Sequence, residues 1–142
     1  MVVRLEFTST FEMLDFVQVV SDHVGQTVGL DDDAQHYVGV AIRECVINAI
    51  KHGNRNDASK HVFVEFSTAN SSGNSADNVL TIRVRDQGEG FDPDAVADPL
   101  APENLLKASG RGIFLIRNFM DAVELRGAPE GGMEVRMVKR VP

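Results

Sequence analysis

The chain has 142 residues, of which 14 are Lys or Arg and 21 are Asp or Glu, so its formal net charge is −7. This length fits one domain with a single core, and the acidic balance without a local basic patch argues against direct binding to nucleic acid phosphates. The single cysteine, Cys45, excludes an intrachain disulfide framework and a cysteine-rich zinc site, which is typical of a reducing compartment. Residues 1–10 contain no long apolar run. We therefore expect neither a secretion signal nor a membrane span, and a cytoplasmic protein.

The start of the chain has the spacing of one strand followed by one helix. Residues 2–8 alternate apolar with polar, the two-residue period of a half-buried strand. From Phe11 to Thr27 the apolar residues recur at spacings of three and four, which predicts a helix with Thr10 as its N-cap and Gly29 at its end. The residues of this helix expected to face the core are Phe11, Leu14, Val17, Val20 and Val24.

A second helix is expected after an acidic run. Asp31–Asp33 precede an apolar stripe, and carboxylates are favoured at helix N-termini, so we interpret this run as a helix start. Gly53 is expected to be the C-cap. The stripe consists of Val38, Ile42, Cys45 and Ala49.

The second half of the chain predicts a sheet with one further helix. The remaining predicted elements are strands at 61–67 and 79–85, a helix at 113–120, and a closing hairpin with strands at 123–126 and 134–138. The small polar residues at 68–78 indicate a hairpin connection. Residues 86–109 hold three prolines and show little periodicity, and a loop of that length in a compact domain is usually functional. The order predicts an α/β (α+β) two-layer sandwich, with a mixed, mostly antiparallel sheet and about three helices on one face.

A polar ridge borders the apolar stripe of the second helix. Glu44, Asn48 and His52 are spaced four residues apart, which places them on one side of a helix. An amide oxygen is a hard neutral ligand for Mg²⁺, and a carboxylate one turn away can accept a proton, so Asn48 and Glu44 together could serve a metal-bound phosphate. The spacing also fits a solvated helix flank with an i,i+4 polar pair. Taken alone, His52 fits a helix-end cation and Lys51 a solvated side chain.

Two glycine-containing segments follow. Asp86 comes directly after a strand, where a carboxylate can accept from an exocyclic amine such as that of adenine, and Gly88 and Gly90 let the backbone approach a flat ligand. Gly110-Arg111-Gly112 precedes a periodic helix, whose free N–H groups, together with the arginine, can bind phosphate. The alternatives are a strand with a glycine-rich turn for the first segment and a hinge into a structural helix for the second.

Taken together and in this order, the three segments resemble the N-box, G1-box and G2-box of the GHKL ATPase superfamily, whose members share the Bergerat ATP-binding fold. Within it, the chain is similar to the anti-sigma-factor serine/threonine kinases of bacteria. The resemblance rests on a single bare ATPase domain over 1–142, on Glu44 four residues before Asn48, and on His52-Gly53-Asn54. Residues 110–121, which read Gly-Arg-Gly-Ile-Phe-Leu-Ile-Arg-Asn-Phe-Met-Asp, are similar to the third block of that family.

The resemblance implies a role for each matching residue. Asn48 is expected to ligate Mg²⁺ on ATP, and Glu44 to be the general base that activates a substrate serine. Asp86 is expected to accept from the adenine amine. The other nucleotide-binding residues implied are Gly88 and Gly90 at the adenine, Gly110, Arg111 and Gly112 at the phosphates, and Lys51, His52 and Lys107, the last within an ATP lid at about 92–109.

The sequence departs from the family pattern at one position. Where the family has Gly-Thr in the last strand, this chain has Gly132-Met133, and the Met133 side chain cannot join the water network of the adenine-binding aspartate. The loss of one neutral hydrogen bond costs about 1 kcal/mol. A second function therefore stays open: an ATP-gated binding protein that sequesters or activates a partner without phosphorylating it. A histidine kinase catalytic domain is a third possibility, but 142 residues leave no space for the dimerisation helices, and Glu44 argues against it.

The resemblance also implies partners. It predicts a cytoplasmic, Mg-ATP-dependent serine kinase that holds a sigma factor and phosphorylates a STAS-type anti-anti-sigma protein. A homodimer is expected by the same analogy, with no direct contact to nucleic acid or membrane.

Overall fold

The computed structural model describes residues 1–70, 78–88, 112–129 and 131–141. These residues form a five-stranded sheet in the order β1-β2-β3-β5-β4, in which every neighbouring pair is antiparallel. The strands are β1 (Val2–Thr8), β2 (His61–Asn70), β3 (Asn78–Arg85), β4 (Ala122–Gly127) and β5 (Met133–Val141). The α-helices are α1 (Met13–Val28), α2 (Asp32–Asn48) and α4 (Gly112–Phe119).

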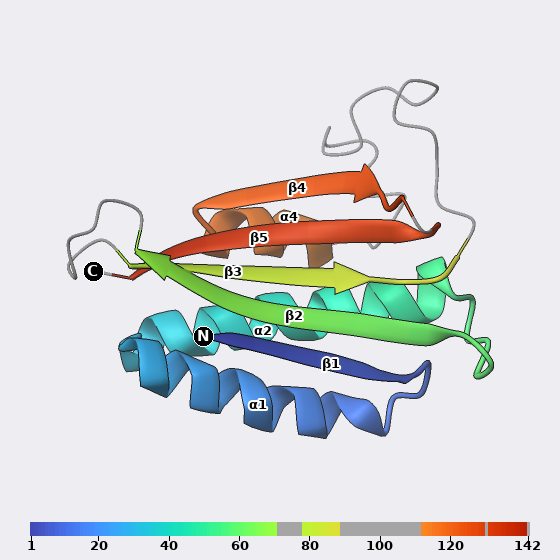
Figure 1. Ribbon diagram of the computed structural model, residues 1–142, viewed down its shortest axis with the longest axis horizontal. Coiled ribbons are helices and arrows are strands. Elements are labelled where there is room, and N and C mark those ends of the chain that lie inside the picture. The colour runs from blue at the N-terminus through green and yellow to red at the C-terminus, as the bar shows by residue number, and fades with distance from the viewer. Residues whose placement is uncertain (71–77, 89–111, 130, 142) are drawn as a thin grey trace.

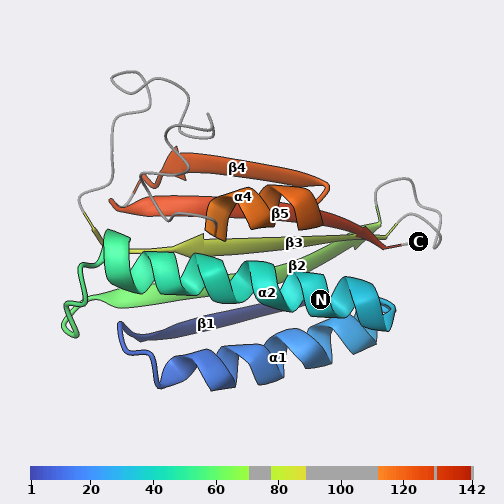
Figure 2. The same ribbon diagram turned by 180° about the vertical axis from the view of Figure 1, so that it is seen from behind.

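The three α-helices lie on one face of the sheet, and no described helix covers the opposite face (Figure 1; Figure 2). This arrangement confirms the predicted two-layer sandwich. The described sheet is antiparallel throughout rather than mixed, because each pair of neighbouring strands runs in opposite directions.

The core lies between the sheet and the helices. In β2 and β3 alternate residues face the helices, and the register places Val64 opposite Val84 and Phe66 opposite Ile82. The predicted stripe of α2, Val38, Ile42, Cys45 and Ala49, is buried against this face. Burying each large apolar side chain stabilises the fold by about 1.5–3 kcal/mol. This contact fixes where the end of α2 meets the end of β3.

The start of α1 differs from the prediction. Glu12 precedes the first helical residue and makes no side-chain capping bond. Thr10 contributes only its backbone carbonyl, which accepts from the Met13 N–H at 3.3 Å, so the prediction of Thr10 as the N-cap is wrong. Phe11 is 48% exposed, and its predicted place in the core is also wrong, because the helix begins after it. Of the other predicted core residues of α1, Leu14, Val17 and Val24 are buried and Val20 is partly buried.

The connection from α1 to α2 agrees with the prediction. Gly29 ends α1 in the left-handed conformation, with φ of +91°, which glycine adopts without strain. Asp31 then caps α2: its side-chain oxygen accepts from the Ala34 N–H at 2.8 Å. The acidic run is therefore a helix start.

The end of α2 is irregular. The α-helix stops at Asn48 and continues as a π-helical turn, η1 (Ala49–Gly53). Gly53 does not have positive φ, and the residue that follows the turn is Asn54. The prediction of Gly53 as the C-cap is therefore wrong, because Gly53 is the last residue of the turn and Asn54 is its cap. Turns of this kind are often found at functional sites.

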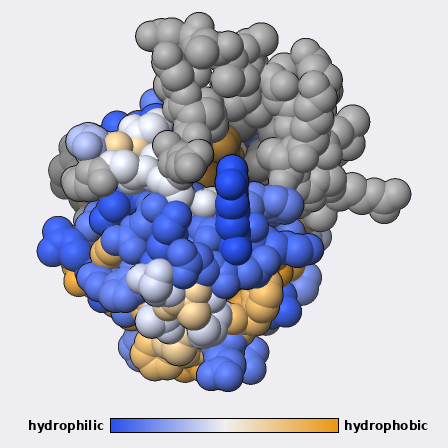
Figure 3. All heavy atoms as spheres, turned by 90° about the vertical axis from the view of Figure 1, so that its right-hand side faces the viewer, coloured by the Kyte–Doolittle hydropathy of each residue, from blue (hydrophilic) through white to orange (hydrophobic). Residues whose placement is uncertain are grey.

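Some apolar side chains are exposed on α1 and just before it. Phe16 and Val19 of α1 are 51% and 66% exposed, and Phe11, which precedes the helix, is 48% exposed. Figure 3 shows apolar spheres gathered toward the lower end of the molecule, the end occupied by α1 in Figure 1, below a largely hydrophilic band. In the described ranges, no helix is both long enough and apolar enough to cross a membrane.

Candidate functional site

Asp86 directly follows β3, and its side chain lies against Gly53 at the end of η1. Its side chain is buried, and Oδ1 accepts from the backbone N–H groups of Gly88 at 2.9 Å and Met133 at 3.1 Å. Burial raises the pKa of the Asp86 carboxyl, although these two N–H groups and the charges of Lys60 and Arg85 oppose the rise. No described residue donates to Oδ2. The carboxylate is thus fixed in orientation and keeps one oxygen for an incoming donor.

Three glycines surround Asp86 at positions where a side chain would not fit. A Cβ on Gly53 would overlap the Asp86 carboxylate and lie 2.8 Å from its Cβ. A Cβ on Gly88 would overlap the Gly53 carbonyl oxygen. Gly132 has φ of +83°, and a Cβ there would overlap the Asp86 carbonyl oxygen and lie 2.9 Å from Oδ1. Backbone from the end of η1, the segment after β3 and the start of β5 therefore closes around one carboxylate.

Met133 reaches Asp86 through its backbone. Its carbonyl accepts from the Asp86 N–H at 3.0 Å, and its own N–H donates to Oδ1. Any residue type can make both backbone contacts, except proline, which has no N–H to donate. The substitution of methionine for the family threonine thus leaves this backbone pairing in place, and only the side-chain hydroxyl is lost.

Asn54 is a central residue of the site that the sequence did not single out for a role. Its side chain is fully buried, and Nδ2 donates to Ser9 Oγ and to the His61 carbonyl at 2.9 Å. Its Oδ1 accepts from the Gln87 N–H at 2.7 Å. The Gln87 side chain in turn accepts from the His61 N–H at 2.7 Å. One amide thus joins the ends of η1, β1 and β3 to the start of β2, and its buried polar atoms are satisfied.

The ridge predicted on α2 is only partly regular. Glu44 and Asn48 are half-buried, one turn apart on the same α-helix. His52 lies in the π-helical turn, where the angle per residue differs from that of an α-helix, and it is exposed like Lys51. Asn48 precedes Gly53 by five residues, roughly 7 Å along a helix axis. Lys51 and His52 adjoin Gly53, which lies against Asp86, and both are exposed, whereas Glu44 and Asn48 are half-buried further back along α2.

Several predicted site residues lie outside the described residues: Gly90, Lys107, Gly110, Arg111 and the lid at about 92–109. Gly112 is the first residue of α4. Within the described ranges, no cluster of three or more His, Cys, Asp or Glu side chains is placed to hold a metal ion. Glu44 and Asn48 offer one carboxylate and one amide oxygen, half-buried one turn apart, and oxygens of this kind suit Mg²⁺ that also keeps phosphate and water ligands.

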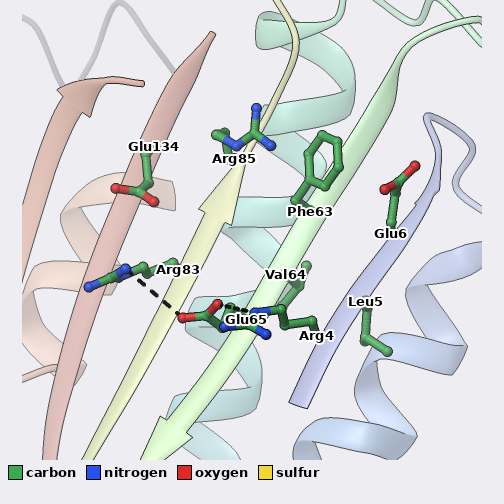
Figure 4. A pocket seen from close by; sticks show the side chains of 9 residues that line it. All are labelled: Arg4, Leu5, Glu6, Phe63, Val64, Glu65, Arg83, Arg85 and Glu134. Carbon is green, nitrogen blue, oxygen red and sulfur yellow. Dashed lines mark hydrogen bonds and ion pairs between the residues drawn. The ribbon is translucent and has the colours of Figure 1, made fainter. Parts of the chain in front are cut away.

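A separate hollow lies on the face of the sheet opposite the helices. It has a volume of about 320 Å³ and is lined by charged side chains of β1, β2, β3 and β5 (Figure 4). Glu65 pairs with Arg4 at 2.7 Å and with Arg83 at 3.9 Å, and the Arg85 guanidinium lies 4.0 Å from the centre of the Phe63 ring. Arg83 Nε is buried without a partner among the described residues. Arg4, Glu65 and Arg83 thus pair with one another. Glu6 and Glu134 pair with His61 and Arg126 outside the hollow, so the hollow has little free charge for a nucleotide.

The comparisons with known proteins agree with this geometry. Residues 7–139 match the family described as the histidine kinase-like ATPase domain. The chain is 34% identical to the anti-sigma F factor of Oceanobacillus iheyensis over 96% of this chain and 90% of that protein. It is 26% identical to the serine-protein kinase RsbW of Staphylococcus epidermidis over 98% of this chain and 86% of that one.

A solved structure has the same fold. The RsbU and RsbW domains of Rv1364c from Mycobacterium tuberculosis match with a TM-score of 0.64 at 14% identity. The match covers the whole of this chain, which spans 33% of that longer protein.

Proposed function

The chain belongs to the histidine kinase-like ATPase domain family, and from this premise we propose that it is an ATP-dependent serine/threonine protein kinase that acts as an anti-sigma factor. The observation that supports this most is Asp86, a buried carboxylate with one oxygen open to a donor and enclosed by residues without a Cβ. An adenine amine matches that acceptor. The relatives named anti-sigma F factor and serine-protein kinase, which are similar over nearly their whole length, support the same function.

Nucleotide binding is assigned to the residues that the resemblance implies. Asp86 accepts from the adenine amine, and Gly88 and Gly90 line the adenine. Asn48 supplies an oxygen to Mg²⁺, which neutralises phosphate charge when it is bound. The remaining contacts are assigned to Lys51, His52, Lys107, Gly110, Arg111 and Gly112, with the lid at about 92–109 within one domain spanning 1–142.

Glu44 is assigned as the general base. A serine hydroxyl of the partner attacks the γ-phosphorus, its proton passes to the Glu44 carboxylate, and ADP leaves as the γ-phosphorus–oxygen bond breaks. Most of the catalysis comes from positioning and from stabilisation of charge. The position of Glu44, one turn before Asn48 on α2, supports this role.

The partners follow from the same proposal. A sigma factor is held inactive, and a STAS-type anti-anti-sigma protein is phosphorylated, in the cytoplasm. Because its net charge is −7, the chain does not bind DNA or a membrane directly. We also assign a homodimer, which sedimentation of the purified chain over a range of concentrations tests.

The proposal is tested by nucleotide binding and then by transfer. In calorimetric titration with ATP and Mg²⁺, the binding free energy of Asp86→Ala should be weaker by about 1–3 kcal/mol, because the adenine amine loses its acceptor. The control Asp33→Ala, at an exposed carboxylate, should bind as the wild type does. A wild-type chain that binds no adenine nucleotide would refute the assignment.

Transfer separates the kinase from a non-catalytic binder. With labelled ATP and a candidate antagonist, Glu44→Gln should retain ATP binding and lose about 10²–10⁴ in rate, whereas the exposed control Glu124→Gln should keep its rate. The missing hydroxyl at Met133 favours the alternative of an ATP-gated binding protein. ATP binding with no transfer in the wild type would support that alternative.

A further inference from the structure

Three consecutive backbone N–H groups after β3 are each held by a different acceptor. The Asp86 N–H donates to the Met133 carbonyl at 3.0 Å, and the Gly88 N–H donates to Oδ1 of Asp86 at 2.9 Å. Between them, the Gln87 N–H donates to Asn54 Oδ1 at 2.7 Å. Of these three acceptors, only that of Asn54 is a side-chain atom from another element. The position of residue 87 therefore depends on the residue type at position 54.

The partners of the Asn54 amide allow it one orientation. The Gln87 N–H can only donate and the His61 carbonyl can only accept, so Oδ1 faces Gln87 and Nδ2 faces His61. The second Nδ2 proton is donated to Ser9 Oγ, which itself donates to the Lys60 carbonyl at 3.0 Å. No other side chain of this length offers one acceptor and two donors in a fixed plane. The site therefore requires an amide of this length.

The main chain around Asn54 is fixed as well. The Asn54 N–H donates to the Ala49 carbonyl at 2.7 Å, and the Asn56 N–H donates to the Ile50 carbonyl at 2.8 Å. Arg55 and Asn56 have φ of +52° and +59°, a left-handed conformation that other residues than glycine adopt where the surrounding contacts require it. Asn54 thus projects its amide from a turn that hydrogen bonds close on both sides.

Gly53 and Asn54 together contact every residue from 86 to 88. Gly53 lies against the Asp86 carboxylate, and its carbonyl oxygen occupies the space that a Cβ on Gly88 would need. Asn54 holds the N–H of the residue between them. Without the Asn54 acceptor, the peptide between residues 86 and 87 loses this hydrogen bond. Its rotation would carry the Gly88 N–H away from Oδ1 of Asp86.

We propose that Asn54 is a positioning residue for nucleotide recognition, which sets the direction of the Asp86 carboxylate by holding the Gln87 N–H. The oxygen of Asp86 to which no described residue donates, Oδ2, must face an incoming amine. Hydrogen bonds weaken steeply with misalignment, so a small rotation of the carboxylate loses recognition even in a folded chain. The inference rests on the proposed function for the identity of the donor, the exocyclic amine of adenine.

The test compares two nucleotides on each variant. ATP carries the exocyclic amine and purine riboside triphosphate lacks it, so the ratio of their Kd values reports the contact with Asp86. In calorimetric titration with Mg²⁺, the wild type should bind ATP at least about tenfold more tightly than the analogue. Asn54→Ala should bind the two within about threefold of each other, because its carboxylate no longer faces the amine. A smaller folded fraction would weaken both nucleotides equally and leave the ratio unchanged.

Ser9→Ala is the matched control within the same network. It removes the bonds to Asn54 Nδ2 and to the Lys60 carbonyl and leaves the contacts of residues 86–88 in place. Ser9→Ala should therefore lower Tm and keep the wild-type ratio. If Asn54→Ala does not fold, Asn54→Thr replaces it, because its hydroxyl is one bond nearer the main chain than Oδ1 and does not reach Gln87. A wild-type ratio in the Asn54 variant, or an equal loss in Ser9→Ala, would overturn the proposal.

A measurement without nucleotide separates this inference from the proposed function. The N–H groups of Gly88 and Met133 both donate to Oδ1 of Asp86, so their NMR proton resonances report where the carboxylate lies. Both should move upfield in the Asn54 variant, as hydrogen bonds to Asp86 weaken, and stay in place in Ser9→Ala. A wild type that binds neither nucleotide, or binds both equally, would contradict the proposed function. Unchanged resonances in the Asn54 variant would overturn the inference alone.

Discussion

Substituting alanine for Gly53 tests the packing around Asp86 directly. Gly53 ends the π-helical turn without positive φ, so alanine meets no backbone strain there. The new Cβ would overlap the Asp86 carboxylate and lie 2.8 Å from the Asp86 Cβ, closer than real Cβ atoms approach a neighbour. Asp86 is buried and held by two backbone N–H groups, so its carboxylate cannot shift without weakening those bonds. Either the carboxylate or the end of the turn must therefore move.

The expected cost follows from those contacts. Overpacking of a well-filled site costs about 1–3 kcal/mol, and moving the carboxylate weakens two backbone hydrogen bonds of about 1 kcal/mol each. Alanine is favoured over glycine in a helix, which offsets about 1 kcal/mol of this loss of stability. The free energy of unfolding should fall by about 2–4 kcal/mol, which lowers Tm by roughly 5–15 °C in a domain of this size. ATP affinity should fall as well, since Asp86 is displaced.

A second glycine provides the matched control. Gly39 is buried within α2, and a Cβ there would lie 3.4 Å from Gln18 Oε1, the end of a flexible side chain. Gly39→Ala should leave Tm unchanged or raise it, because alanine is favoured in a helix. Calorimetry and nucleotide titration of both variants decide the matter. Wild-type Tm and wild-type ATP affinity in Gly53→Ala would refute the close approach of Gly53 to Asp86.

Three other outcomes are expected. Asp86→Asn should weaken adenine binding, because the adenine amine loses its charged acceptor. It should raise Tm at neutral pH, because asparagine keeps an acceptor for the two N–H groups and removes a buried charge. Burial raises the pKa of the Asp86 carboxyl, so ionisation of this group opposes folding at high pH, and the Tm advantage of the asparagine variant should shrink as pH falls through the raised pKa. Asn54→Ala should cost about 2–4 kcal/mol in urea denaturation, since Ser9 and Gln87 lose their partner. Burial raises the pKa of the Cys45 thiol, so iodoacetamide should label it in urea and leave it unlabelled in the native chain.

Local periodicity predicted most of the fold, because burial on one side of a helix or strand sets the spacing of apolar residues that are close in the sequence. The α2 stripe and the pairing of β2 with β3 follow from spacing and turn chemistry alone. Phe11 shows the limit of this reasoning. It has the right spacing for the core of α1, yet the helix begins after it, and no local signal marks that boundary.

The site was harder to predict, because its geometry depends on contacts between distant segments. Asp86 was singled out as a carboxylate at the end of a strand, and the structure places it in a buried position there. The sequence predicted Gly53 only as a helix end, because its contact with Asp86 forms only once β3 lies beside α2. Asn54 was named as part of the His52-Gly53-Asn54 match but was given no role, because its hydrogen bonds reach residues far away in the chain. Met133 was judged by its side chain, whereas its contact with Asp86 comes from the backbone.

The hydrogen bonds of Asn54 and Asp86 affect how fast the protein folds and unfolds. The hydrogen bonds that hold the site join residues 45, 33 and 47 positions apart, so the site is complete only when segments between Ser9 and Met133 have come together. Loop closure makes such long-range contacts late. A nucleotide that binds only the completed site slows unfolding and does not speed folding. At a concentration one hundred times its Kd it adds about 2.7 kcal/mol to the free energy of unfolding. The ATP level of the cell would then help to set the lifetime of the folded chain.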